Sequence, residues 1–206
     1  MTDSGKDGAL LAAATGNANK LREIGEILAE FGIKVISKKE AGAGDLETEE
    51  TGSTFEENSL LKAEDVMKAV GMDAIADDSG LVVDALDGAP GVYSARFAGE
   101  NASDEENNAK LLRMMEKVPD GERTARFVCV MTLCRTDGSV IRARGECPGR
   151  ILRAPRGEGG FGYDPLFVPD GYEESFAELS EEQKNGISHR AKALAALREK
   201  ISKEGL

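Results

Sequence analysis

Apolar and polar positions along the first part of the chain predict two strand–helix units. Residues 9–14 form a small apolar run typical of a buried strand, and apolar residues between 21 and 31 recur close to the helical period. A second apolar run at 33–37 precedes another helix, which we expect to begin at Thr54 and to end near Val70. This alternation of strands and helices is typical of an α/β fold.

The later part of the chain predicts an antiparallel strand pair between two helices. Residues 103–118 are expected to be helical, with a capping box at Ser103 and Glu106. Residues 123–135 and 139–146 alternate as strands around a Thr-Asp-Gly turn, so they predict a hairpin. Residues 178–201 are predicted to hold a last helical segment, which opens with a second capping box. Because a hairpin is antiparallel, we expect the sheet to be mixed.

Two adjacent acids, Asp77 and Asp78, stand between the apolar runs 74–76 and 81–86. A strand that ended here would deliver both carboxylates to the mouth of the sheet, where they repel each other unless a cation lies beside them. Magnesium is the simplest candidate, because it prefers carboxylate oxygens. The alternative is a turn, since Asp-Asp-Ser-Gly is also good turn chemistry. Both interpretations stay open on this stretch alone.

A polar turn lies between the first strand and the first helix, with the sequence Thr15-Gly16-Asn17-Ala18-Asn19-Lys20. Such a turn points backbone N–H groups and the helix dipole at its occupant and therefore favours an anion. The lysine adds a positive charge. The alternative is a capped helix start with an incidental lysine. A Walker A loop is excluded, because GxxxxGK[ST] occurs nowhere in the chain.

The second helix carries a polar pair, Asn58 and Lys62, four positions apart and therefore on one face. If this face lines a cleft, the pair can hold phosphate oxygens, and if it faces outward the pair is simply solvated. The loop before this helix contains Glu47, Glu49 and Glu50, an acidic pattern that is typical of solvated surface.

The stretch 157–162 matches GxGxxG, the dinucleotide-binding pattern. That interpretation fails, because the pattern needs a helix after it and Tyr163-Asp164-Pro165 follows instead. One remaining interpretation is close backbone approach to a flat ligand, with Phe161 stacking and Asp164 hydrogen-bonding. The other is a glycine-rich hairpin with a core aromatic residue.

Polar and cationic residues crowd the start of the last helix, namely Lys184, Ser188, His189 and Arg190. His189 is the only histidine, and a lone histidine is more often structural than catalytic. Lysine and arginine side chains donate hydrogen bonds only. A pocket built from them therefore favours a base edge with carbonyl oxygens over one with an amino group.

The composition narrows the class of protein. A formal net charge of −12 over 206 residues repels nucleic-acid phosphates, and no window approaches the ~20 apolar residues of a membrane span. Residues 1–8 are polar and lack the apolar region of a signal peptide. Cys129, Cys134 and Cys147 form no CxxC pair, so we expect neither a zinc site nor a disulfide framework, and a reducing cytoplasm fits best.

A series of motifs occurs here in one order: TGNANK, EETG followed by TFEENSLLKA, ADDSGLVVDALDGAPGVYSARFAG, GGFGYDPLF and ISHRAKAL. Together they resemble the inosine triphosphate pyrophosphatase family, the XTP/dITP diphosphatases that remove deaminated purine nucleotides. The resemblance spans about residues 10–197 and leaves 1–8 outside as a polar extension. It implies a single two-lobed domain over 9–206, with an elongated mixed sheet flanked by helices and a central substrate cleft. It also implies a homodimer.

The resemblance further implies magnesium-dependent hydrolysis of ITP, dITP or XTP to the monophosphate and pyrophosphate. The metal ligands of the family match Asp78 and Glu49, with the adjacent Glu50 as an alternative to the latter. The catalytic positions match Asp78, as base or only as metal ligand, and Lys62, which would contact phosphates. The substrate-binding positions match Thr15, Gly16, Asn17, Ala18, Asn19, Lys20, Ser79, Phe161, Gly162, Tyr163, Asp164, Lys184, His189 and Arg190.

Two other functions stay open. A related pyrophosphatase that acts on modified pyrimidine nucleotides would share the fold and the metal-binding acids. A nucleotide sensor without turnover would also bind the triphosphate. The presence of Asp78, Glu49 and Lys62 together argues against the sensor, because binding alone does not need a carboxylate that activates water.

Overall fold

The computed structural model describes residues 9–204 and shows one six-stranded sheet in the order β2-β1-β3-β4-β5-β6. The strands β1, β2 and β3 are parallel, and β3 to β6 are antiparallel neighbours. The predicted α/β class and mixed sheet are therefore confirmed. The strands are β1 Leu10–Ala13, β2 Lys34–Ser37, β3 Ala74–Val83, β4 Thr124–Cys134, β5 Val140–Ile151 and β6 Phe167–Pro169.

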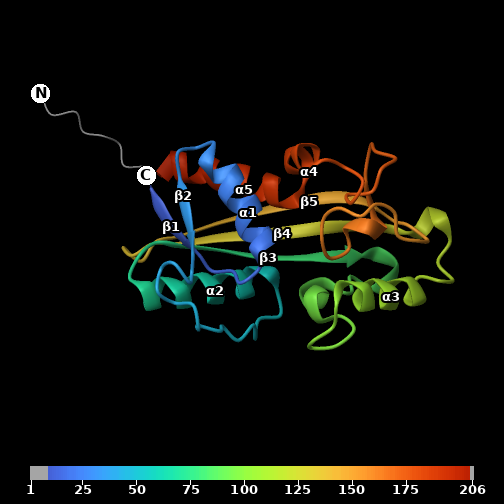
Figure 1. Cartoon of the computed structure of the whole chain (residues 1–206), viewed down its shortest axis with the longest axis horizontal. Coiled ribbons are helices and arrows are strands. Elements are labelled where there is room, and N and C mark those ends of the chain that lie inside the picture. The colour runs from blue at the N-terminus through green and yellow to red at the C-terminus, as the bar shows by residue number, and fades with distance from the viewer. Residues whose placement is uncertain (1–8, 205–206) are drawn as a thin grey trace, which may run out of the picture.

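Helices flank both faces of this sheet (Figure 1). The predicted capping boxes are present at the starts of α3 and α4, and a third opens α2 at Thr54. The last helical segment is not continuous, because Ser188 adopts an extended backbone with ψ 157° and separates α4 from α5. The helices are α1 Ala18–Ala29, α2 Phe55–Val70, α3 Asp104–Met114, α4 Glu181–Ile187 and α5 His189–Glu204.

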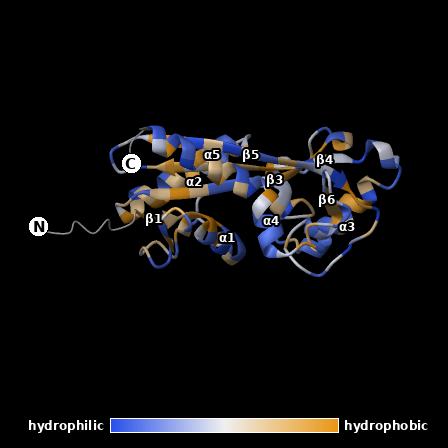
Figure 2. Cartoon of the chain, turned by 90° about the horizontal axis from the view of Figure 1, so that it is seen from above, coloured by the Kyte–Doolittle hydropathy of each residue, from blue (hydrophilic) through white to orange (hydrophobic). Residues whose placement is uncertain are grey.

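Separate buried apolar clusters lie at the two ends of the long strands β3, β4 and β5. At one end, helices α1 and α5 pack on one face of the sheet and α2 packs on the other. This end, with β1 and β2, is called here the first lobe. At the other end, α3 and β6 pack around Phe127, Phe167 and Phe176, and this end is called the second lobe. Helices α1 and α5 carry both hydrophilic and hydrophobic positions, as expected for helices with one face on the sheet (Figure 2).

Strand β3 runs without interruption through the two adjacent acids. Asp77 pairs with Met131 of β4, and Asp78 pairs with Val130. The expectation of a strand that ends at the acids is therefore wrong, and so is the alternative of a turn. The acids reach a cleft for another reason: β1 pairs with β3 only at Ala74 and Ile75, so the edge of β3 is left open beyond that point. Side chains alternate along a strand, so the two carboxylates point to opposite faces.

The remaining expectations concern the termini and the cysteines. The polar extension 1–8 lies outside the described residues. All three cysteines are buried and free, which agrees with the expectation that they form no disulfide framework. Within residues 9–204, no helix combines the length and the apolar character needed to cross a membrane.

Candidate active site

The first part of the site is a small charged cluster around Asp78, where β3, α2 and the loop before α2 meet. Lys62 projects from α2, and its Nζ lies 2.7 Å from Asp78 Oδ1 and 3.0 Å from Glu50 Oε1. Arg96, at the end of the 3₁₀ helix Gly91–Arg96, lies 3.5 Å from the same glutamate. The face of α2 that carries Lys62 therefore looks into a cleft, which was one of the two options for the predicted Asn58–Lys62 pair. Asn58 itself is buried, and its Oδ1 accepts from the Gly52 N–H.

Among the described residues, one carboxylate oxygen of this cluster is left without a partner. Asp78 is only 7% exposed, and among residues 9–204 its Oδ2 has no hydrogen-bond partner. Burial raises the pKa of Asp78, and the nearby Lys62 only partly offsets this rise. Burial also acts to raise the pKa of Glu50, but there Lys62 prevails and the pKa is lowered. A free, buried carboxylate oxygen close to a second carboxylate fits a hard divalent cation.

The second carboxylate of this cluster is Glu50, not Glu49. Glu49 is exposed, while Glu50 contacts both Lys62 and Arg96 and lines the same cavity as Asp77. Glu50 therefore replaces Glu49 as the candidate metal ligand. No group of three or more possible ligands gathers anywhere in 9–204. Two protein carboxylates suffice for magnesium, which usually keeps several waters and takes the rest of its ligands from phosphates.

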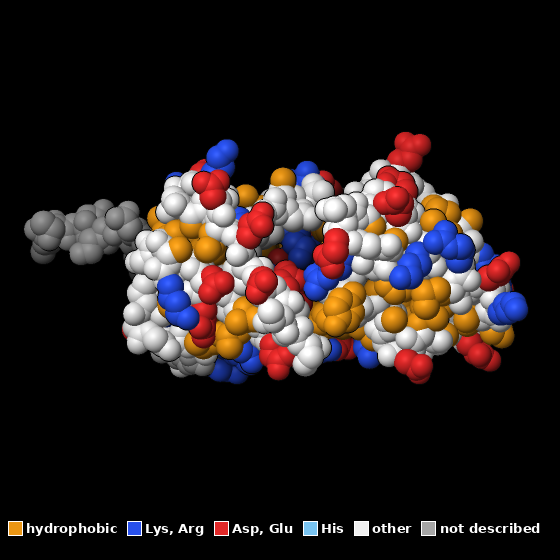
Figure 3. All heavy atoms as spheres, turned by 90° about the horizontal axis from the view of Figure 1, so that it is seen from below, with side chains coloured by type: hydrophobic (Ala, Val, Ile, Leu, Met, Phe, Trp, Pro, Cys, Tyr) orange, Lys and Arg blue, Asp and Glu red, His pale blue; other side chains and the backbone are white. Residues whose placement is uncertain are grey.

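The turn between β1 and α1 is both a helix cap and part of a cavity. Asn17 Oδ1 accepts from the N–H groups of Asn19 and Lys20, and Thr15 Oγ1 accepts from the Asn17 N–H. The capped helix start is thus present, but the lysine is not incidental: its Nζ lies 3.0 Å from Asp77 Oδ2. A cavity of about 430 Å³ opens here, and its wall includes Thr15, Gly16, Asn17, Lys20, Glu50, Lys62 and Asp77. The side of the molecule that carries α2 and α3 is hollowed near its middle, where acidic and basic side chains gather (Figure 3).

A second charged cluster lies on the other face of β3, around Glu23 of α1. Glu23 bonds to Arg190 and lies 3.2 Å from Lys184 Nζ. Lys184 also pairs with Asp164 at 2.8 Å, and Arg190 lies 3.5 Å from Asp77. All of these side chains are buried. In this cluster every carboxylate has a cationic partner, although among residues 9–204 Asp77 Oδ1 has no hydrogen-bond partner.

The burial of this second cluster decides the charge states of its members. Burial acts to raise the pKa of Asp77, but Lys20 and Arg190 hold it well below its usual range. Burial together with the neighbouring Arg190 and Lys184 lowers the pKa of His189 well below its ordinary value, so the imidazole is neutral. The His189 ring stacks on Phe127, with ring centroids 4.8 Å apart. His189 is therefore a packed, neutral side chain.

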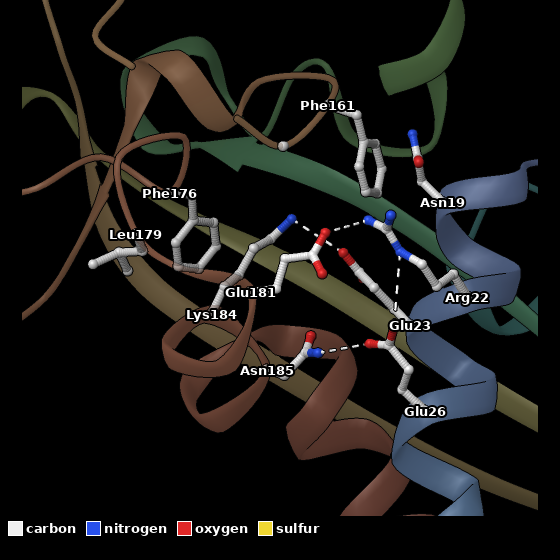
Figure 4. A pocket seen from close by; sticks show the side chains of 11 residues that line it. Asn19, Arg22, Glu23, Glu26, Phe161, Phe176, Leu179, Glu181, Lys184 and Asn185 are labelled. Atoms are coloured by element: carbon white, nitrogen blue, oxygen red, sulfur yellow. Dashed lines mark hydrogen bonds and ion pairs between the residues drawn. The ribbon is translucent and has the colours of Figure 1, made fainter. Parts of the chain in front are cut away.

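The close view in Figure 4 shows how α1 and α4 meet beside this cluster. Arg22 lies 2.6 Å from Glu181, and Asn185 donates to Glu26 at 3.2 Å. These contacts cross a small cavity of about 60 Å³ whose wall includes Phe161 and Lys184. Glu23, Lys184 and Phe161 stand around this cavity in the view, so α1 directly supports the residues expected to bind the base.

A pocket of about 130 Å³ lies between this cluster and the second lobe. It includes Asn17, Lys20, Ser79, Asp104, Gly162, Tyr163 and Asp164, with Phe161, Lys184, His189 and Arg190. Lys184 Nζ lies 4.7 Å from the centre of the Phe161 ring, and the Arg190 guanidinium 5.8 Å. Among residues 9–204, Arg190 Nε and His189 Nδ1 have no hydrogen-bond partner. The pocket thus joins an aromatic face to at least one free donor.

The loop that carries Phe161 uses its polar groups mainly for its own support. Asp164 Oδ2 accepts from the Phe161 N–H at 2.9 Å while it pairs with Lys184, so this carboxylate holds the loop. Because Asp164 Oδ2 already accepts from two groups of the protein, this oxygen does not support the predicted hydrogen bond from Asp164 to a ligand. A side chain at Gly160 would place Cβ 2.2 Å from the same oxygen, which explains that glycine. The loop leads into the 3₁₀ helix Asp164–Leu166 and not into an α-helix, in agreement with rejection of the dinucleotide pattern.

Sequence reasoning missed Glu23, Arg96 and Asp104. Glu23 carried the clearest signal, since it stands beside Ile24 in a helix whose buried face is otherwise apolar. An acid at such a position needs a cationic partner, but the pattern does not say which one. Of the matched positions, Ala18 and Asn19 start α1, and Ser79 donates to Asp77 at 2.8 Å.

Known proteins resemble this chain in sequence and in fold. The model of the Ham1 family matches residues 11–200. A dITP/XTP pyrophosphatase of Desulforamulus reducens is 53% identical over 184 residues, 89% of this chain and 91% of the relative. One from Geobacter sulfurreducens is 52% identical over 196 residues, 95% and 98% of the two chains. The solved Ham1 protein of Staphylococcus aureus superposes with a TM-score of 0.84 at 42% identity, covering 95% of this chain and all of that one.

Proposed function

This chain belongs to the Ham1 family, and from that premise we propose that it hydrolyses the triphosphates of non-standard purines, ITP, dITP and XTP, to the monophosphate and pyrophosphate. It is a nucleoside triphosphate pyrophosphatase, and its role is to clear such nucleotides from the pool. The observation that carries the proposal is the free, buried oxygen of Asp78 close to Glu50, beside the two lysines Lys20 and Lys62.

The cavity beside β3 is suited to a metal-bound triphosphate. Glu50 and Asp78 would hold magnesium, which when bound neutralises phosphate charge and lowers the pKa of a coordinated water. Lys20 and Lys62 would contact the phosphate tail, because they line the same cavity as Glu50, and Lys62 also contacts Asp78. Pyrophosphate is a strongly anionic leaving group, so cations that face it stabilise the transition state.

Asp78 is the group suited to the attacking water. One of its oxygens is held by Lys62, and the other is free to accept a hydrogen bond. A carboxylate fixed in this way can orient the water towards the α-phosphorus or take its proton. The raised pKa of Asp78, caused by burial, makes it a stronger base than an exposed aspartate.

The pocket beside Phe161 would hold the base. Phe161 would stack on the purine, and the free Nε of Arg190 would donate to its 6-oxo group. Adenine carries an amino group at that position, so ATP would place a donor against a donor. An unpaired buried donor costs ~1–3 kcal/mol, or up to about a hundredfold in affinity. Lys184, bonded to Glu23 and Asp164, would act chiefly by its charge.

We also propose that the protein works as a homodimer in the cytoplasm. The three buried, free thiols are compatible with a reducing compartment. Size-exclusion chromatography with light scattering would test the dimer: a single species at the monomer mass over micromolar concentrations would reject it.

The activity is tested by pyrophosphate release from ITP, XTP, GTP, ATP and dUTP, with magnesium and with EDTA. We expect fast, magnesium-dependent release from ITP and XTP and little from the others. Release from dUTP instead would favour the pyrimidine alternative. Binding of ITP without release would favour a sensor.

A further inference from the structure

Helix α3 of the second lobe reaches the loop that carries Phe161. The first residue of α3 is Asp104, and its Oδ2 accepts from the Gly162 N–H at 2.6 Å. One turn later, Asn108 Nδ2 donates to the Gly162 carbonyl at 2.9 Å. Two side chains of one helix therefore hold both backbone polar groups of one loop residue, 54 and 58 positions away in the sequence.

The position of this pair on α3 follows from local rules. Ser103 caps the helix and forms a capping box with Glu106, which fixes Asp104 in the first turn. Residues four apart lie one above the other on a helix, so Asp104 and Asn108 face the loop together. Asn108 is buried, and within 9–204 its Oδ1 has no partner. The side chain of Asn108 is therefore held by the hydrogen bond from Nδ2 to Gly162. Burying an amide whose oxygen is unpaired costs free energy, and the hydrogen bond to Gly162 offsets part of this cost.

Gly162, the loop residue held by Asp104 and Asn108, directly follows Phe161, whose ring is expected to stack on the base. Gly162 has φ +63°, a conformation that other residues adopt only with strain. Phe161, directly before it, lines the base pocket, and Asp104 lines the same pocket. On the far side of Gly162, Tyr163 is fixed by a bond from its hydroxyl to the Ser94 carbonyl at 2.8 Å. Because Phe161 is covalently next to Gly162 and Tyr163 is fixed on the other side, a shift of Gly162 is passed on to Phe161.

We propose that Asp104 and Asn108 are positioning residues that set the place of the Phe161 ring against the base. They act on base affinity and on selectivity among purines, through Phe161, and not on the phosphate chemistry. This rests on the proposed pyrophosphatase function. It extends that function by giving the second lobe a defined part in base recognition.

The test uses Asn108→Leu, which removes the donor with little change of volume, and Asp104→Ala. For each variant we expect KM for ITP to rise about fivefold to tenfold while kcat stays within about twofold, since one hydrogen bond to the loop is lost. The ITP-over-ATP ratio of kcat/KM should fall. Asp104→Asn keeps an accepting oxygen and should recover most of the loss. Glu105→Ala, an exposed acid next to Asp104 in the same first turn, is the matched control and should leave KM unchanged.

A probe without a base separates positioning from a general disturbance. Inorganic tripolyphosphate should inhibit the wild type and the Asn108→Leu variant with the same inhibition constant, because Phe161 does not contact phosphates. IMP should raise the melting temperature of the wild type more than that of the variant.

The proposal is overturned if KM for ITP is unchanged in folded Asn108→Leu, or if tripolyphosphate inhibition weakens as much as ITP binding. It is also overturned if Asp104→Asn behaves like Asp104→Ala, since charge alone would then explain the effect. A failure of the proposed function looks different, because the wild type itself would then release no pyrophosphate from ITP. Should Asp104→Ala not fold, the Asn108→Leu and Asp104→Asn variants decide the question.

Discussion

The two charged clusters on either face of β3 differ in the number of their ion pairs and in how deeply they are buried. Around Asp77, three acids (Glu23, Asp77 and Asp164) meet three cations (Lys20, Lys184 and Arg190), all within contact distance. Around Asp78, two acids share Lys62, with Arg96 reaching Glu50 from outside. Acids and cations are equal in number in each cluster, but the first is more deeply buried and the second is more open, with Glu50 and Arg96 partly exposed.

This difference indicates what each cluster can bind. A deeply buried network of ion pairs holds its members in place and offers shape and the free donor Arg190 Nε, which suits a neutral base. The more open cluster presents the partly exposed Glu50 and the free oxygen of Asp78, so it can bind a divalent cation, and with the cation it attracts phosphates. Asp77 and Asp78 are neighbours in the sequence, but the alternation of side chains along β3 places them in different networks.

The difference between the two clusters is tested most strongly by replacing Asp77 and Asp78, one at a time, with asparagine. Asp78→Asn should lower pyrophosphate release from ITP about 10²–10⁴-fold, because the water loses its orienting carboxylate. It should lower the free energy of unfolding only slightly, since Lys62 keeps Glu50 as a partner at 3.0 Å. Asp77→Asn should instead mainly lower the free energy of unfolding, because Lys20 and Arg190 lose a partner. Rate measurements and urea unfolding on both variants decide the point: if both changes mainly affect the same quantity, the two clusters are not distinct.

The buried network around Asp77 should be destabilised by the loss of any of its cations. Arg190→Ala leaves Glu23 and Asp77 buried without this partner, and we expect a loss of about 3–5 kcal/mol in the free energy of unfolding. Arg144→Ala is the control, because Arg144 pairs with Glu56 and Glu146 at the surface and should change stability by less than about 1 kcal/mol. Equal losses in the two variants would contradict the special role of the buried network. Any folded Arg190→Ala protein should also show a smaller preference for ITP over ATP.

The proposed metal site of the open cluster around Asp78 is tested by comparing two adjacent glutamates, Glu49 and Glu50. Glu50→Gln should raise the magnesium concentration needed for half-maximal rate by roughly tenfold or more, because a ligand oxygen loses its charge. Glu49→Gln should behave as the wild type, since that side chain is exposed. A magnesium titration of the rate with ITP distinguishes them. The reverse order of effects would restore Glu49 as the ligand.

The smallest expected effect concerns pH. Burial keeps His189 neutral, so its pKa in the folded protein is below that in the unfolded chain. Below about pH 6.5 the unfolded chain therefore binds a proton that the folded one does not, and stability falls as pH falls, by at most about 1.4 kcal/mol per pH unit. Unfolding free energies between pH 7 and pH 5 should show this slope in the wild type and less of it in His189→Phe. An identical slope in both proteins would mean that a group other than His189 causes this pH dependence of stability.

Much of the fold could be predicted because its causes are local. The capping boxes at Ser103 and Ser180 were predicted and are present, and so was the hairpin between β4 and β5. The errors arose where distant parts of the chain decide. Strand β3 continues through two acids because β4 pairs with it along its whole length, which the acids themselves do not reveal.

In the candidate site, too, local features could be predicted and contacts between distant parts of the chain could not. Its residue types and motifs could be predicted from the sequence, including both lysines and the glycine-rich loop. The partners of Glu23 could not, since Lys184 and Arg190 lie 161 and 167 positions away. The contact of Asp104 with Gly162 was missed for the same reason.

The sequence by itself therefore determined the elements, their caps and the family motifs, because each depends on neighbours within a few positions. Only the tertiary structure decided that Glu50 and not Glu49 faces Lys62, that Asp77 pairs with Lys20 and Arg190, and that Asp78 pairs with Lys62. Burial and the nearest opposite charge set the state of a carboxylate. Both are properties of the folded chain, and two adjacent acids with the same local sequence can receive them differently.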